Sequence, residues 1–164
     1  MAKPKHAKAK NAPKKPAKPT AKKTKRSKPL TFADQLGVKE GAVIVCLHCK
    51  EQFLTRMRNQ LPPYARLFPT VPEGRQVDII IRFFNEHADF DSSFRWLERQ
   101  LTPDGIIWGV IPKKSVLKKG ERYLLDDMVK AAHRTTLQKA RELNFSPVEQ
   151  AVKFTIRKEH RKKE

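Results

Sequence analysis

The sequence contains only two cysteines and six glycines, and its first 29 residues contain no acidic side chain. Two cysteines without an apolar leader segment argue against a secreted protein built on disulfides. No apolar run approaches the roughly 20 residues that a helix needs to cross a bilayer. We therefore expect a cytoplasmic protein without a membrane partner, associated with the nucleoid if it binds DNA.

Basic charge is concentrated at the N-terminus. Residues 1–29, "MAKPKHAKAKNAPKKPAKPTAKKTKRSKP", hold 11 Lys and one Arg, and none of the 17 acids of the chain. The segment has no apolar side chain larger than alanine after Met1, and five prolines interrupt any helix. We expect a disordered basic tail over 1–30, an α/β domain over 31–158 and a basic end over 159–164.

Such a tail binds polyanions by releasing condensed counterions, which makes binding sensitive to salt and independent of base sequence. Its Lys/Ala/Pro composition resembles the tails of linker histones and of bacterial nucleoid-associated proteins, which implies DNA or RNA as the partner. The alternative is a solubilising tail without a specific partner. The residues expected to bind nucleic acid are Lys3, Lys5, Lys8, Lys10, Lys14, Lys15, Lys18, Lys22, Lys23, Lys25, Arg26 and Lys28.

Beyond Pro29, strand-like and helix-like blocks alternate. Continuous apolar runs, which are typical of buried parallel strands, occur at 42–47, 77–84 and 106–111. The alternating segment 152–156 predicts a half-exposed or edge strand. Helical patterns occur at 50–61, 92–101 and about 126–144. Together the blocks predict a small Rossmann-like three-layer α/β domain with a mostly parallel sheet of about four strands.

Polar side chains follow the predicted parallel strands, where ligands of open sheets bind. The candidate cleft residues are His48, Cys49, Asn85, His87, Lys113 and Lys114. Their cationic character suits a small anionic ligand with a phosphate or carboxylate group. The alternative is that these residues are the ordinary polar filling of a sheet edge.

The stretch "IVCLHCKEQF" (44–53) contains both cysteines. We expect Cys46 to be a buried, inert side chain of the first strand, and Cys49 to lie near the start of the following helix. A C-x-x-C pair can be redox active, but the usual pair does not place its first cysteine within the strand. Zinc needs four ligands, and the chain offers no second pair. We therefore expect no metal and leave redox activity open.

An acidic run, Glu86, Asp89 and Asp91, precedes the second predicted helix. It could serve metal binding or acid–base chemistry, but capping of the helix by Asp91 or Ser92 is the simpler interpretation. No P-loop, H-E-x-x-H or kinase motif can be found.

The segment "VDIIIRFFNEHADFDSSFRWLERQLTPDGIIWGVIPKK" is similar to the corresponding part of Rossmann-like class I methyltransferases. The whole body resembles a bacterial family of small Rossmann-like proteins of unknown function, whose "lWv..PK" block is matched by Trp108, Pro112 and Lys113. The resemblance implies a fold and no particular reaction. Methyltransferases bind their cofactor with a glycine-rich loop after the first strand, and "CLHCKEQF" has no glycine there.

The sequence thus favours a protein that binds nucleic acid non-specifically through its tail, with a non-catalytic body and no cofactor. The alternative is a small-ligand-binding or degenerate methyltransferase-like enzyme domain with a cleft at the C-terminal edge of the sheet. The sequence does not indicate an oligomeric state.

Overall fold

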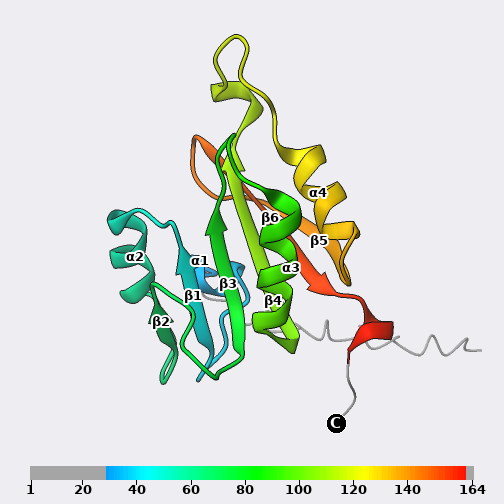
Figure 1. Ribbon diagram of the computed structural model, residues 1–164. Coiled ribbons are helices and arrows are strands. Elements are labelled where there is room, and N and C mark those ends of the chain that lie inside the picture. The colour runs from blue at the N-terminus through cyan, green and yellow to red at the C-terminus, as the bar shows by residue number, and fades with distance from the viewer. Residues whose placement is uncertain (1–28, 162–164) are drawn as a thin grey trace, which may run out of the picture.

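The computed structural model describes residues 29–161, which form a three-layer α/β domain around a six-stranded sheet (Figure 1). The tail residues expected to bind nucleic acid, Lys3 to Lys28, lie outside the described part of the chain. The strands are β1 Val43–Leu47, β2 Arg66–Phe68, β3 Val77–Phe83, β4 Leu101–Pro112, β5 Leu137–Asn144 and β6 Glu149–Ile156. Their order in the sheet is β2-β1-β3-β4-β6-β5.

The sheet is mostly parallel, as expected, but the expectation of about four strands is wrong. Strands β2, β1, β3 and β4 are parallel neighbours, and β6 runs antiparallel to both β4 and β5. Strand β2 could not be predicted from a sequence pattern, because it is three residues long and lies in a proline-rich loop. Its pairing with β1, from Val43 opposite Arg66, is what makes it a strand.

The expected long helix over 126–144 is also wrong, because it ends early and gives way to β5. Helix α4 spans Leu125–His133. The hydroxyl of Thr135 then donates to the carbonyl of Ala132 at 2.6 Å and accepts from the amide of Leu137 at 3.1 Å, which turns the chain. Strand β5 pairs with β6 as a hairpin and forms the edge. The segment expected as an edge strand, β6, is therefore interior.

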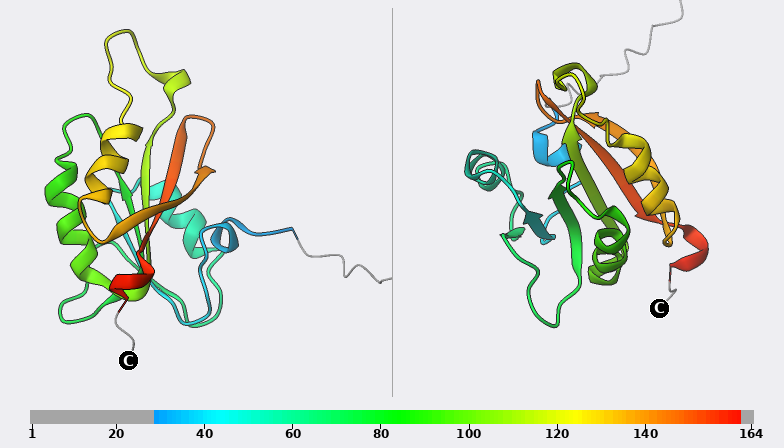
Figure 2. Two further views of the ribbon diagram at one scale, coloured as in Figure 1. Left: turned by 90° about the vertical axis from the view of Figure 1, so that its right-hand side faces the viewer. Right: turned by 45° about the horizontal axis from the view of Figure 1, so that its top comes forward.

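Helices cover both faces of the sheet (Figure 2). One face carries α1 Phe32–Gln35 and α2 Glu51–Arg58, and the other carries α3 Phe90–Gln100 and α4. Side chains of β3 alternate between the two cores, because successive residues of a strand point to opposite faces: Ile79 and Ile81 face α1 and α2, whereas Ile80 faces α3 and α4. The expected three layers are confirmed.

Two short 3-10 helices, η1 Lys114–Val116 and η2 Lys158–His160, lie at opposite ends of the domain. The buried indole Nε1–H of Trp108 in β4 donates to the carbonyl of Leu36 at 2.9 Å and ties α1 to the centre of the sheet. Within residues 29–161, no helix has the length and apolarity required to traverse a bilayer.

Candidate functional site

A hollow of about 580 Å³ opens at the C-terminal edge of the parallel strands. It is lined from the ends of β1, β3 and β4, from the start of α3 and from the start of β6. Figure 2 (right) turns this edge, which is at the top of Figure 1, toward the viewer. His48, Asn85 and His87, three of the six candidate cleft residues, line the hollow. Loops that follow parallel strands meet beyond the carboxyl ends of those strands, which is why these three residues lie together.

The other three candidates do not line this hollow. Cys49 is turned toward Cys46, with which it forms a disulfide. Lys113 donates its amide to the carbonyl of Val148 at 2.9 Å, and Lys114 opens η1 with its side chain exposed. Lys113 and Lys114 therefore contribute no charge to the lining, and its cationic side chains are instead Lys50 and Arg82.

The loop between β1 and α2 is a closed turn. The disulfide joins Cys46, which is 2% exposed, to Cys49 over a Cα–Cα distance of 5.8 Å. Between them His48 has φ +56°, in the left-handed region that glycine adopts more readily. Cys46 is buried as expected, but it is not an isolated thiol. The cross-link closes the turn in which His48 adopts this left-handed conformation.

Three charged lining residues were not among the sequence candidates, namely Lys50, Glu149 and Arg82, and Arg82 is the most buried guanidinium or ammonium group of the hollow. It lies near the end of β3, paired with Leu47 of β1 on one side and Gly109 of β4 on the other. Its guanidinium carbon is 5.0 Å from the ring centroid of Phe84. Desolvation by burial lowers the pKa of Arg82. The signal was present as a single charged residue inside the otherwise apolar run "IIIRFF".

The Nε atom of Arg82 is buried and has no hydrogen-bond partner within residues 29–161, and it is the one buried side-chain nitrogen or oxygen there for which this holds. Buried polar atoms are normally paired, and an orphan needs an explanation such as an absent ion or ligand. Arginine cannot escape the cost by losing its proton, because its pKa stays above the physiological range.

Two carboxylates also line the hollow, but each has other partners. Asp89 caps α3 by accepting from the Ser92 amide at 3.1 Å and from the Ser92 hydroxyl at 2.7 Å, and these bonds lower the pKa of Asp89. Glu149 pairs with Lys50 at 3.3 Å and accepts from Ser146 at 3.3 Å. Neither acid forms a salt bridge with Arg82.

Capping of α3 thus accounts for Asp89 in the acidic run, although the cap is Asp89 itself and not Asp91 or Ser92. Asp91 pairs with Arg134 of the α4 C-terminus at 2.7 Å. Across residues 29–161, no cluster of three or more His, Cys, Asp or Glu side chains is arranged to hold a metal ion.

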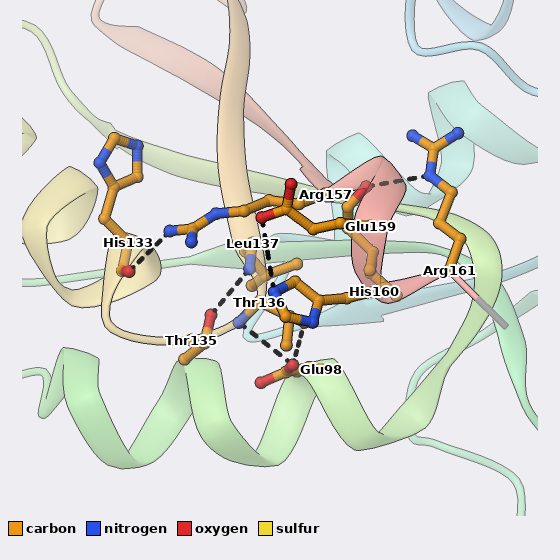
Figure 3. Close-up of polar contacts among 10 residues, drawn as sticks. Glu98, His133, Thr135, Thr136, Leu137, Arg157, Glu159, His160 and Arg161 are labelled. Carbon is orange, nitrogen blue, oxygen red and sulfur yellow. Dashed lines mark hydrogen bonds and ion pairs between the residues drawn. The ribbon is translucent and has the colours of Figure 1, made fainter.

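A second hollow, of about 400 Å³, lies at the opposite edge of the sheet and is lined by Glu98, Thr136 and His160 among others (Figure 3). Here no buried side-chain nitrogen or oxygen lacks a partner within residues 29–161. Glu98 of α3 accepts from the amide of Thr136 at 3.2 Å and also from its hydroxyl. The Arg157 guanidinium donates to the carbonyl of His133 at 2.9 Å. These contacts fasten α3, α4 and β6 together.

No family model matches this sequence, and no curated protein matches it. Solved structures do share its architecture. A methyltransferase from Aquifex aeolicus that depends on S-adenosylmethionine aligns with a TM-score of 0.59 at 14% identity, over 75% of this chain and 86% of that one. Aeropyrum pernix fibrillarin with natively bound S-adenosyl-L-methionine aligns with a TM-score of 0.55 at 14% identity, over 73% and 69%. The fold is the Rossmann-like methyltransferase fold.

The mitomycin 7-O-methyltransferase MmcR also shares the fold, with a TM-score of 0.51 at 14% identity, and this chain covers 49% of its length. The expectation of a non-catalytic body on a DNA- or RNA-binding tail is contradicted, because two of these structural neighbours are methyltransferases and the third holds S-adenosyl-L-methionine. They favour the alternative, a methyltransferase-like domain with a cleft at the C-terminal edge.

The loop after β1 does not have the glycine-rich sequence with which methyltransferases bind S-adenosylmethionine. Glycine-rich loops let the backbone approach a cofactor closely after the first strand. At that position this chain has His48, with a side chain and a left-handed backbone, inside the turn closed by the Cys46–Cys49 disulfide. The next glycine along the chain is Gly74. The turn after β1 therefore lacks the glycine cradle for this cofactor.

Proposed function

We propose that this chain is a methyltransferase-like domain that binds a small molecule in the hollow at the ends of β1, β3 and β4. The observation that carries the proposal is the hollow itself, about 580 Å³ in volume and lined from five separate segments, all of which except the end of β4 contribute polar side chains. This volume falls within the range of small-molecule pockets, roughly 300–1,000 Å³. The shared fold supports the choice of edge, because ligands of open α/β sheets bind beyond the carboxyl ends of the strands.

The test is thermal unfolding of the full chain with S-adenosylmethionine, S-adenosylhomocysteine, adenosine and adenosine 5′-monophosphate, each added separately. A ligand at 100 times its dissociation constant adds about 2.7 kcal/mol to the free energy of unfolding. We expect at least one probe to raise the unfolding midpoint. The His48→Trp variant, which adds bulk to the lining of the hollow, should lose that rise.

Adding bulk at an exposed position outside the hollow provides the matched control. Arg58 lies on α2, is exposed and does not line the hollow. Arg58→Trp should therefore keep the full rise. If no probe stabilises the wild-type chain, or if His48→Trp responds as well as Arg58→Trp, the proposal is wrong.

A further inference from the structure

We propose that Arg82 is the anchor of an anion site in this cleft, and that the ligand presents a carboxylate or phosphate group to its guanidinium. The inference rests on the proposed function, because it concerns the ligand of the same hollow. It specifies which chemical group of that ligand the chain recognises and which side chain does so.

The first argument is the unpaired donor. The Nε–H of Arg82 is buried, has no acceptor within residues 29–161 and belongs to a side chain that lines the hollow. Leaving a charged donor buried and unsatisfied costs more than leaving a neutral one. An oxyanion in the hollow would accept from Nε–H and offset the charge at the same time.

The second argument is that the neighbouring acids are already engaged. Asp89 accepts from Ser92 through both carboxylate oxygens, and Glu149 accepts from Lys50 and Ser146. An arginine whose natural partner was one of these acids would form a salt bridge with it, as Arg134 does with Asp91 at 2.7 Å. Arg82 has no such bond within residues 29–161, so an anion that enters the hollow can supply its counter-charge.

The third argument is geometry. Arg82 lies between the paired residues Leu47 and Gly109 on neighbouring strands, and its guanidinium packs over the Phe84 ring. The rigid backbone of a central strand and the aromatic ring restrict the guanidinium before any ligand arrives. A planar, restricted guanidinium suits the two-oxygen face of a carboxylate or phosphate better than a flexible ammonium does.

The experiment uses two pairs of probes that differ by one anionic group. Adenosine 5′-carboxylate has an anionic group where adenosine 5′-carboxamide has a neutral one, and adenosine 5′-monophosphate has a phosphate that adenosine lacks. Inorganic phosphate is the fifth probe. Dissociation constants come from calorimetry on the full chain, and the Arg82 Nε–H resonance is followed by nuclear magnetic resonance.

We expect the anionic member of at least one pair to bind about tenfold tighter or more than its neutral partner, as for a hydrogen bond to a charged group. The pair that shows the preference tells carboxylate from phosphate. The same probe should shift the Arg82 Nε–H resonance. Arg82→Met should abolish the preference, whereas Arg58→Met, on an exposed arginine of α2 outside the hollow, should preserve it.

The outcomes separate the two proposals. If neutral and anionic members bind equally well, the anion site is wrong while the ligand cleft stands. The same follows if Arg82→Met retains the preference. Should Arg82→Met fail to fold, an unshifted Nε–H resonance in the wild-type chain saturated with the anion overturns the inference by itself. If no probe binds, inorganic phosphate included, both proposals fall.

Discussion

Charged side chains differ in their bonding between the two edges of the central sheet at which the strands begin and end. At the edge where β4 begins and β6 ends, Glu98, Arg157 and Arg161 each bond to a group of the chain itself (Figure 3). At the opposite edge, where β1, β3 and β4 end, Arg82 keeps a buried nitrogen without a partner. Both edges are hollowed. The contrast lies in whether every buried side-chain nitrogen and oxygen has a hydrogen-bond partner, and only the edge with Arg82 has one without.

The difference in hydrogen bonding follows from the elements that meet at each edge. Glu98 joins the end of α3 to the turn between α4 and β5, where the amide of Thr136 would otherwise lack an acceptor. The opposite edge carries the loops after parallel strands, which need not bond to one another. Substitutions at the two edges should therefore have opposite consequences for stability and for binding.

The largest effect on stability is expected at the edge where Glu98 bonds to Thr136. Glu98→Ala removes the acceptor of both the amide and the hydroxyl of Thr136, which are part-buried. Leaving a buried donor unpaired costs about 1–3 kcal/mol of the free energy of unfolding. Chemical denaturation would measure this loss. Glu98→Gln keeps one side-chain oxygen and should lose less, and ligand binding at the other edge should not change in either variant. Equal stability of Glu98→Ala and wild type would contradict the assignment.

The next effect concerns the closed turn beside the cleft. Reducing the Cys46–Cys49 disulfide with a dithiol removes a constraint on the unfolded chain worth roughly 2 kcal/mol for so short a loop. We expect the unfolding midpoint to fall and amide exchange to accelerate at His48 and Lys50, with no change at Thr136. A variant with both cysteines replaced by alanine should be insensitive to the dithiol. A wild-type midpoint that the dithiol leaves unchanged would show that the bridge does not support the fold.

A smaller effect of opposite sign is expected at Arg82. Methionine resembles the arginine stem in shape but brings no buried donor, so Arg82→Met should leave stability unchanged or raise it by about 1 kcal/mol. Gains of this kind are typical where a binding residue is strained or unsatisfied. Denaturation without ligand is the measurement, with Arg134→Met as comparison, since it breaks a pair with Asp91. A marked loss in Arg82→Met would mean that its charge already has a partner.

Much of the fold could be predicted from hydrophobic patterns, because β1 and the central parts of β3 and β4 are apolar runs flanked by amphipathic helices. Strand β5 could not. Its sequence "LQKARELN" consists mostly of residues that favour helices, and its side chains are largely exposed, so neither period nor burial marks a strand. Pairing with β6 decides its conformation, which is a tertiary effect that overrides local propensity.

The site was predictable to the extent that topology determines it. His48, Asn85 and His87 follow strands whose carboxyl ends share an edge, so a parallel sheet brings them together. Lys113 and Lys114 follow β4 by the same rule, yet the chain turns into η1 and carries them away from the hollow. Arg82 was missed because position within an apolar run was interpreted as packing, whereas a charge there is the exception that needs a partner.

The smallest expected effect is the pH dependence at Asp89, which lines the same hollow as Arg82. Hydrogen bonds from Ser92 lower the pKa of Asp89 in the folded chain below the value of about 3.9 for an unfolded aspartate. Because the folded pKa is the lower one, the stability from this cap is fully present above the unfolded pKa. It is lost as the pH falls through the folded pKa.

Nuclear magnetic resonance titration of the Asp89 carboxyl measures this shift directly. Ser92→Ala should raise the pKa of Asp89 toward the unfolded value, since the Ser92 hydroxyl is its main hydrogen-bond donor. Arg82→Met should leave it unchanged, because Asp89 bonds to Ser92 and forms no salt bridge with Arg82. A rise in Arg82→Met as large as in Ser92→Ala would make Asp89 the counter-charge of Arg82, and the contrast between the two edges would then disappear.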